Sequence, residues 1–418
     1  MSFSPAVIFW FVWFGLALTG CAERAVTPQP ASVSSLLVGL SGDYPPFCLV
    51  DGAGEGWQGY SGFDAELLRK LEADLGWSLR PARFEWPRLA SAMAEGRYDL
   101  AACGVTVRPD RVASMLFSRP YATSGAVAVI RAKAGIRPAT LDDLNRPGVR
   151  IGVNAGGHLE RVTRQRFGRA TIQTLSDNRQ LPELLKSGAV DAVISDVHEA
   201  ARWPNVKTLG PFTQDLKALA LLLDHLHERE AVNAWLAGLE ANGWLSAQRR
   251  RLGVVDAELT PAGYCAVSLA STLELRFALM PMVAAVKLRD GLPINDPRQE
   301  ARVLDQVRAK AEGLGLAEQA AVELFRVLME DAKRIQARNP MPPSTVNGLD
   351  LARLRSAVAG ASDAVLPEIG RCQSLLRGRQ SVMTDALAAR LGQWLRPDEL
   401  TALARLLPPL RDFSRTQP

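Results

Sequence analysis

One change of pattern along the chain limits its possible folds more than any other feature. Up to about residue 252, short β-branched runs alternate with helical segments, whereas hardly any such run occurs between residues 268 and 418. Alternation of strands and helices is typical of an α/β sheet, and a long Ala-, Leu- and Arg-rich stretch with helical periodicity is typical of an all-α unit. The sequence therefore predicts a multidomain protein, with an α/β unit at 36–252, a linker at 253–267 and a helical domain at 268–418.

The α/β unit is expected to have two lobes. A second series of strands and helices starts near residue 149, and a helical segment at 231–252 returns the chain to the first half. Two such units with a returning segment favour a cleft between the lobes. We expect lobe 1 at about 36–125 plus 213–252 and lobe 2 at about 130–212. The strands are expected at 36–40, 98–102, 126–130, 149–153 and 189–195, and the first helix at 63–75.

The N-terminal segment indicates export. Residues 7–18 are almost entirely apolar and are followed by Leu18-Thr19-Gly20-Cys21. This run is shorter than the ~20 residues of a membrane-spanning helix, which favours a signal segment. Small residues before a cysteine resemble a bacterial lipoprotein signal, which implies a signal at 1–21, lipidation of Cys21, a tether at 22–35 and a periplasmic location. Because residues 1–20 contain no Lys or Arg, an uncleaved apolar anchor is the alternative.

Composition and charge exclude several classes. The chain is 47% hydrophobic and 22% charged, which excludes a mainly disordered protein. The net charge is only +5, and the charges do not form long blocks, so we expect no nucleic-acid partner. His225 and His227 are close in sequence, but no Cys or further His completes a ligand set, and we expect no metal site.

The cysteine count is compatible with disulfides. Export and cleavage would leave an even number in a compartment that permits disulfide formation. Their pairing stays open from the sequence. The four residues are Cys48, Cys103, Cys265 and Cys372.

A series of short motifs runs through the α/β unit and includes Arg111. The motifs are Gly42-Asp43-Tyr44-Pro45-Pro46-Phe47, Gly62-Phe63-Asp64, Trp86-Pro87, Gly104-Val105-Thr106, Asp110-Arg111 and Phe117-Ser118-Arg119-Pro120-Tyr121. In order and spacing they resemble the periplasmic solute-binding proteins that capture polar amino acids. The resemblance implies that Arg111 holds a ligand carboxylate, which suits the bidentate grip of a guanidinium. Thr106 and the amides near Gly104 would complete this pocket, and Asn154, Gly156 and Gly157 would contribute from lobe 2.

Three further segments resemble a group of enzymes within that family, the periplasmic cyclohexadienyl dehydratases. They are Trp86-Pro87-Arg88-Leu89, Asn154-Ala155-Gly156-Gly157 and Asp196-Val197-His198-Glu199-Ala200. The third is the most informative, because a spacing of three places Asp196 and Glu199 on one side of a helical turn. The resemblance implies conversion of prephenate to phenylpyruvate and of arogenate to phenylalanine.

This chemistry suggests roles for the residues of the cleft. Hydroxide leaves poorly, so an acid should protonate it, and a Glu can do so at neutral pH only if its pKa is raised. Glu199 is the expected general acid, with Asp196 beside it, and Glu160 is the alternative acid. Arg111 and Asn154 would hold carboxylates, while Tyr44 and Trp86 would enclose the ring. His158 stands where Thr is usual and Thr106 where Ser is usual, which leaves the choice between prephenate and arogenate open.

The helical domain resembles the exported, all-helical chorismate mutases. The matching segments are 276–287, Leu292-Pro293-Ile294-Asn295-Asp296 and 325–336. Arg276 and Lys287 are 11 residues apart, about three helical turns, and therefore share a face. The resemblance implies that Lys287 and Gln336 contact the ether oxygen of chorismate. Arg276 and Arg355 would bind its carboxylates.

The helical domain also departs from that family's pattern. Gln299 stands where Arg is usual, and the neighbouring Arg298 is a candidate substitute. Glu300 matches an acid that orients the substrate hydroxyl, and Ala332 replaces a Ser or Thr.

Together the two resemblances imply one exported bifunctional enzyme of phenylalanine biosynthesis, since the mutase makes the prephenate that the dehydratase consumes. No metal or organic cofactor is expected, and the dehydratase resemblance implies a homo-oligomer, with a trimer favoured. The alternative is an amino-acid-binding lipoprotein of a transport or sensing system with a helical partner-binding domain. Glu199 and the set Arg276, Lys287 and Gln336 discriminate, because a binding protein needs none of them.

Overall fold

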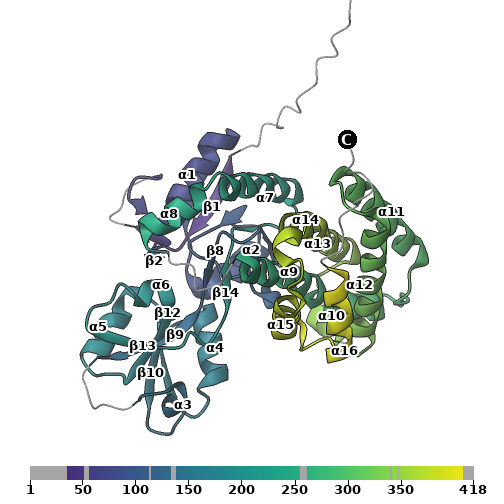
Figure 1. Ribbon diagram of the computed structural model, residues 1–418. Coiled ribbons are helices and arrows are strands. Elements are labelled where there is room, and N and C mark those ends of the chain that lie inside the picture. The colour runs from purple at the N-terminus through teal and green to yellow at the C-terminus, as the bar shows by residue number, and fades with distance from the viewer. Residues whose placement is uncertain are drawn as a thin grey trace, which may run out of the picture.

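The computed structural model describes residues 35–50, 56–112, 114–132, 138–254, 261–338, 341–346 and 348–407. It contains a two-lobed α/β unit followed by a helical domain, which confirms the predicted fold class. Figure 1 shows the helical domain packed beside lobe 1. The predicted signal segment, Cys21 and most of the tether lie outside the described residues.

Lobe 1 is built on a five-stranded sheet whose central strands are buried. The strand order is β5 (Leu79–Arg83), β1 (Leu36–Leu40), β6 (Leu100–Ala101), β15 (Ala220–Leu221) and β7 (Leu116–Phe117). A small sheet joins β2 (Asp43–Tyr44), β3 (Cys48–Val50) and β4 (Tyr60–Ser61). The helices are α1 (Phe63–Leu75), η1 (Trp86–Arg88), α2 (Leu89–Ala94), η2 (Pro109–Arg111), α7 (Leu226–Ala241) and α8 (Trp244–Leu252).

Lobe 2 has its own five-stranded sheet, in the order β11 (Thr171–Leu175), β10 (Arg150–Asn154), β12 (Ala192–Asp196), β9 (Ala126–Arg131) and β13 (Val206–Leu209). Its helices are α3 (Leu141–Leu144), α4 (His158–Arg166), η3 (Asn178–Gln180), α5 (Leu181–Lys186) and α6 (Val197–Ala200). The antiparallel pair β8 (Ala122–Ser124) and β14 (Asp215–Lys217) carries the chain between the lobes in both directions. The carboxyl ends of β10 and β12 therefore face lobe 1, where a cleft is expected.

The helical domain consists of α9 (Pro261–Ala278), α10 (Met280–Arg289), α11 (Pro297–Gly313), α12 (Glu318–Arg338), η4 (Pro343–Val346), α13 (Leu351–Asp363), α14 (Val365–Leu376), α15 (Gln380–Leu391) and α16 (Pro397–Leu406). The stretch Ala262–Arg289 is long and apolar enough to cross a membrane, but 72% of its most apolar window is buried. It is therefore the central core element of this domain. The two disulfides are Cys48–Cys103 in lobe 1 and Cys265–Cys372, which links α9 to α14.

Three expected helix boundaries differ from the structure. The segment expected at 231–252 is two helices, because Gly243 adopts a left-handed conformation between α7 and α8. The stretch from Arg276 to Lys287 is divided at Leu279, since Pro281 lacks the N–H that a continuous helix would use. Helix α9 begins at Pro261, seven residues before the expected domain start, and proline is favoured at such a first position.

Lobe 1 and the helical domain share one hydrophobic core. Leu116 and Phe117 of β7 belong to the same buried cluster as Leu269 and Leu273 of α9. The Tyr264 hydroxyl also donates a hydrogen bond of 2.8 Å to the carbonyl of Pro120. The two units are therefore packed as one body and not joined by a linker alone.

Candidate active sites

The first candidate site is the interlobe cleft, the space between lobe 1 and lobe 2. Lobe 1 supplies the aromatic wall, in which Tyr44 and Trp86 meet edge to face with ring centroids 5.8 Å apart. Lobe 2 supplies the start of α4. The lining residues are Tyr44, Trp86, Gly104, Thr106, Arg111, Asn154, Gly157, His158, Leu159 and Lys217.

Arg111 is positioned in this cleft without a counter-ion. The side chain is buried, and its Nη1 has no hydrogen-bond partner. The nearby Asp110 is held by Arg108, whose Nε donates to it over 2.9 Å. Burial and, next, the charge of Arg108 lower the pKa of Arg111 to about 9. A buried guanidinium in this state is suited to bind an anion, most directly a carboxylate.

The loop beside Arg111 is fixed by a residue that the motifs placed in lobe 1, Asp64. Its Oδ2 accepts the backbone N–H groups of Cys103 and Gly104 at 2.5 and 2.6 Å, and the Tyr121 hydroxyl at 2.7 Å. Gly104 has a φ of 64°, and a Cβ there would lie 2.8 Å from the Phe47 ring. Glycine is therefore required where this loop meets the aromatic wall.

Lys217 is a cleft residue that the sequence analysis missed. Its Nζ lies 3.1 Å from Asp196 Oδ2 and donates to Thr106 Oγ1 at 3.0 Å and to the Tyr44 hydroxyl at 3.1 Å. The only sequence signal is a lysine at the edge of the apolar run 216–223. Burial alone would raise the pKa of Asp196, but Lys217 and His198 lower it to about 2. Asp196 is thus an ionised carboxylate already paired with a cation.

Glu199 is in a different electrostatic state from Asp196. Its Oε1 accepts from Asn178 Nδ2 at 2.7 Å, and its Oε2 accepts from Ser195 Oγ at 2.5 Å. Burial raises the pKa of Glu199 to about 8, with Asp196 and Asp43 adding to the rise. Glu199 therefore carries a proton at neutral pH. It is not among the lining residues, but its charge acts on Tyr44, and the charge of Asp43 acts on it.

The alternative acid, Glu160, has the opposite properties. Its Oε2 accepts the Gly156 N–H at 2.6 Å, and its Oε1 lies 2.7 Å from Arg164 Nη2. Burial is the largest single effect and raises its pKa, but these two donors together hold the pKa of Glu160 below its usual range. Glu160 is therefore ionised, and both of its carboxylate oxygens already have partners at the start of α4. His158, which departs from the family pattern, lies 2.9 Å from Asp215 Oδ1.

The two lobes are in contact across the cleft. A Cβ on Gly156 of lobe 2 would lie 2.4 Å from Pro87 Cα of lobe 1. Asn154 is buried, and its Oδ1 has no partner. The remaining cavity volume is about 20 Å³, enough for water but not for an organic ligand. A ligand can therefore enter only when the lobes separate.

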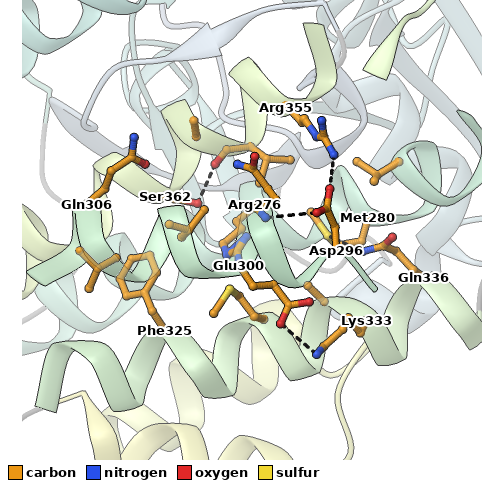
Figure 2. A pocket seen from close by; sticks show the side chains of 18 of the residues that line it. Arg276, Met280, Asp296, Glu300, Gln306, Phe325, Lys333, Gln336, Arg355 and Ser362 are labelled. Carbon is orange, nitrogen blue, oxygen red and sulfur yellow. Dashed lines mark hydrogen bonds and ion pairs between the residues drawn. The ribbon is translucent and has the colours of Figure 1, made fainter. Parts of the chain in front are cut away.

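The second candidate site is the helical cavity, which has a volume of about 460 Å³. Figure 2 shows side chains from α9, α10, α11, α12 and α13 that point into this one space. Cations and other polar groups line much of the cavity, while Val283, Val303 and Phe325 supply apolar wall. The polar lining includes Arg276, Lys287, Asp296, Gln299, Glu300, Lys310, Lys333, Gln336, Arg355 and Asp363.

Three of the expected residues meet in this cavity, and two of them, Arg276 and Gln336, have polar atoms without a partner. Arg276 is buried, and its Nε and Nη1 have no partner. Burial lowers the pKa of Arg276 to about 10, against the opposing charge of Asp331. Lys287 Nζ donates to the Ile294 carbonyl at 2.7 Å, and burial lowers its pKa too. Gln336 is buried beside Met280, and its Oε1 has no partner.

The remaining expected residues divide into three groups. Arg355 lines the cavity, but its Nη2 is paired with Asp296 Oδ2 at 2.6 Å. Gln299 and Glu300 also line the cavity, and Glu300 lies 3.4 Å from Lys333, a cation that the sequence analysis missed. Arg298 is exposed and is not among the lining residues, so the structure does not bring it to the position of the missing arginine. One residue along a helix is a rotation of about 100°, which explains why a neighbour cannot substitute.

Comparison with known proteins gives a family match for each of the two units. Residues 36–252 match the family described as bacterial extracellular solute-binding proteins, family 3, and residues 267–337 match chorismate mutase type II. The cyclohexadienyl dehydratase of Pseudomonas aeruginosa is 30% identical over 217 residues, which are 50% of this chain and 79% of that protein. The L-cystine-binding protein TcyJ of Escherichia coli K12 is 28% identical over 243 residues, which are 56% of this chain and 88% of that protein.

A solved structure is also similar. It is the ancestral amino acid-binding protein AncCDT-1, described as a precursor of cyclohexadienyl dehydratase. The sequence identity is 27% and the TM-score 0.49, with 52% of this chain and 95% of that chain covered.

The fold and the cleft thus define a two-lobed solute-binding class with an added helical domain. The chain belongs to the bacterial extracellular solute-binding proteins, family 3, and carries a chorismate mutase type II domain behind that unit. Both resemblances drawn from the motifs are confirmed by these matches. Membership in an extracellular family also agrees with the predicted export.

Proposed function

We propose that this chain is a bifunctional enzyme that converts chorismate to prephenate in the helical cavity and prephenate to phenylpyruvate in the interlobe cleft. One observation carries the proposal. A single chain holds a buried carboxyl with a pKa of about 8 at the cleft and, separately, a cavity in which Arg276, Lys287 and Gln336 present unused or weakly used polar groups. The similarity to a cyclohexadienyl dehydratase and to chorismate mutases supports both halves.

The mutase step requires positioning and electrostatic stabilisation. In chorismate the ether C–O bond breaks as a C–C bond forms within the same molecule, so no nucleophile or proton transfer is needed. Arg276, with its unpartnered nitrogens, is assigned to a carboxylate. Lys287 and the amide of Gln336 are assigned to the ether oxygen, where negative charge grows. Arg355 would have to exchange Asp296 for the second carboxylate.

The dehydratase step requires an acid. Prephenate loses its ring carboxylate as carbon dioxide, the bonding electrons enter the ring, and the ring hydroxyl departs. Glu199 donates the proton that makes the leaving group water, and solvent returns the proton afterwards. Arg111, whose Nη1 has no partner in the cleft, is assigned to a substrate carboxylate, and Asn154 is assigned to donate to the other carboxylate through its amide Nδ2. Separation of the lobes admits the substrate, and their closure removes water from around Glu199.

The pairing of Asp196 with Lys217 favours prephenate over arogenate. Arogenate carries an ammonium where prephenate carries a keto group, and an ammonium needs a free carboxylate nearby. Asp196 is already neutralised by Lys217 at 3.1 Å, and the cleft also contains the uncompensated charge of Arg111. A cleft with this balance suits a dianion.

The remaining parts of the proposal concern the state of the protein in the cell. We assign a lipid anchor to Cys21 at the end of the signal segment, a periplasmic location, and a homo-oligomer with a trimer favoured. No cofactor is assigned to either step. The division into lobe 1, lobe 2 and the helical domain is kept as proposed, with the helical domain starting at α9.

The deciding experiment is incubation of the purified protein with chorismate, followed by identification of the products. Formation of phenylpyruvate through prephenate is expected. Glu199→Gln should accumulate prephenate, whereas Lys287→Ala should lose only the mutase step while still converting added prephenate. If neither chorismate nor prephenate is consumed and an amino acid binds tightly instead, the chain is the amino-acid-binding lipoprotein of the alternative hypothesis.

A further inference from the structure

A third cavity lies where lobe 1 meets the helical domain, and neither proposed reaction uses it. We call it the interface cavity; its volume is about 260 Å³. Helix α7 and the loop after β7 line it from lobe 1, with Arg229 and Arg119, and helices α9 and α14 line it from the other side, with Ser271 and Glu368. Helices α7, α9 and α14 lie near one another in Figure 1.

Arg229 is the unusual feature of this cavity. Five arginines are buried in the described part of the chain. Two of them have carboxylate partners, since Arg108 is bound to Asp110 and Arg249 to Glu240. The other three are Arg111, Arg276 and Arg229; each has an unpartnered guanidinium nitrogen, and none forms an ion pair with a described residue.

The comparison with Arg111 and Arg276 indicates a ligand-binding role for Arg229. Arg111 lies in the interlobe cleft and Arg276 in the helical cavity, where each is free to receive a substrate carboxylate. Arg229 repeats the arrangement in a cavity with no assigned ligand: its side chain is 3% exposed, and its Nε has no partner. Burial of a cation that has no ion-pair partner is unfavourable, and a bound anion would offset that penalty.

The acidic groups around the interface cavity do not supply that anion. Glu368 is held by Arg371 and accepts from Ser268 Oγ at 2.8 Å. Asp363 lies 3.1 Å from Lys310 Nζ and forms no ion pair with Arg229, although its charge opposes the lowering of the Arg229 pKa by burial more strongly than that of Glu230. Glu230 is exposed and makes no ion pair with a described residue, and it acts on Arg229 only through its charge.

Two further groups in the cavity have unused atoms. Arg119 Nη1 and Ser271 Oγ are buried without a partner. Both can donate hydrogen bonds, as can Arg229. Phe117 and Leu275 supply apolar wall beside these donors.

From this arrangement we propose that the interface cavity is a binding site for a small organic carboxylate with an apolar body, held by Arg229 with help from Arg119 and Ser271. A planar carboxylate matches a guanidinium in two parallel hydrogen bonds, and the apolar wall accommodates the rest of such a molecule. A phosphate ion would fit less well, because its additional charge and oxygens would face apolar side chains.

Binding can be measured apart from both substrate sites. The full chain with Arg111→Gln and Arg276→Gln lacks the two other buried arginines that form no ion pair, and benzoate serves as the probe in isothermal titration. We expect this double variant to bind one equivalent of benzoate, and the addition of Arg229→Gln to weaken binding at least about tenfold. No binding to the double variant, or binding indifferent to Arg229→Gln, would overturn the proposal.

Controls separate loss of the site from loss of the fold. Circular dichroism must show the same helix content and a cooperative melt, and Arg229→Lys, which keeps the charge, should retain more affinity than Arg229→Gln. Glu230→Gln removes a negative charge from the rim and should strengthen benzoate binding, so weaker binding in this variant contradicts the assignment. Inorganic phosphate that binds more tightly than benzoate would replace the carboxylate with a phosphate ligand.

The site should also influence the mutase reaction, a consequence that rests on the proposed function. Lys310 and Asp363, which form an ion pair, line both the interface cavity and the helical cavity. Saturating benzoate is therefore expected to change the KM for chorismate, and Arg229→Gln should remove this change. An effect that persists in Arg229→Gln is competition in the helical cavity and refutes the linkage. If the protein shows no mutase activity at all, the titration still decides whether the site exists.

Discussion

The ammonium of Lys217 lies 3.1 Å from the carboxylate of Asp196, and both side chains are at most 2% exposed. Lys217 comes from β14 and Asp196 from the end of β12, so the pair joins the strand that returns to lobe 1 with the edge of lobe 2. Lys217 also donates to Tyr44 and Thr106. This ion pair therefore keeps Asp196 ionised, in contrast to Glu199, whose pKa is raised.

Lys217→Met should abolish the dehydratase step while the mutase step continues. The substitution leaves Asp196 buried and unpaired and removes a donor from Tyr44 and Thr106, and loss of such electrostatic organisation lowers rates by about 100-fold or more. Conversion of added prephenate and of added chorismate, measured separately, checks this. The double variant Lys217→Met/Asp196→Asn should melt at a higher temperature than Lys217→Met alone, because no buried charge is left unpaired. A lower melting temperature for the double variant would argue against this pairing.

The dehydratase rate should fall in alkaline solution. The acid form of Glu199 is required, and the pKa of Glu199 is raised to about 8. The value of kcat/KM for prephenate should therefore be level below pH 8 and decrease about tenfold per pH unit above it. Glu160→Gln is the matched control, because the pKa of Glu160 is lowered and its titration lies far below this range. Loss of the dehydratase step in Glu160→Gln, with activity retained in Glu199→Gln, would transfer the acid role to Glu160.

The same group should make stability depend on pH. The pKa of Glu199 is raised in the folded state from 4.5 to about 8, so the folded protein binds a proton that the unfolded chain has released. Stability from this group is complete below pH 4.5 and is lost as pH rises towards 8, by about 1.4 kcal/mol per pH unit. Glu199→Gln, which remains neutral, should gain melting temperature relative to the natural protein as pH rises. A difference in melting temperature that is constant with pH would contradict this.

Local motifs alone predicted several of the residues that meet in the cleft. These residues lie in short segments near the ends of neighbouring strands. Tyr44, Thr106, Arg111 and Asn154 lie in short segments whose order matches the family, and the fold brings them to one cavity. Lys217 could not be found in this way, since its role depends on the pairing of β14 with β8 and on a partner in the other lobe. Side chains that act across a long sequence separation leave no local pattern.

In the helical domain, too, the sequence pattern could not determine how side chains are oriented in the packed structure. Periodicity predicted that Arg276 and Lys287 share a helix face; the helix is interrupted at Leu279, but both residues line the helical cavity. It could not decide between Arg298 and Gln299, because only the rotation of α11 determines which neighbour faces inward. The disulfide partners were open for a similar reason, since the contact between α9 and α14 is a property of the packed domain.

Gln299→Ala and Arg298→Ala should therefore differ in the mutase reaction. Gln299 lines the helical cavity, whereas Arg298 is exposed outside it. Loss of one polar contact should raise the KM for chorismate about fivefold in Gln299→Ala, and Arg298→Ala should change it less than about twofold. Initial rates of chorismate loss measure both. The reverse order would mean that α11 is rotated from its position in this structure.

Gly156→Ala should impair the dehydratase step by preventing closure of the lobes. Gly156 has a φ of 72°, and a Cβ there would lie 2.4 Å from Pro87 Cα, a backbone atom that cannot move aside as a flexible side chain could. The KM for prephenate should rise at least about tenfold, because closed-state contacts from Asn154 and Glu199 would be lost. Gly188→Ala is the matched control, since Gly188 has a φ of 78° but nothing within 4 Å of an added Cβ. Both variants carry the same backbone strain of about 1 kcal/mol, so a similar loss of stability is expected in each, but only Gly156→Ala should lose prephenate affinity. Equal effects on KM would show that strain, and not contact between the lobes, is responsible.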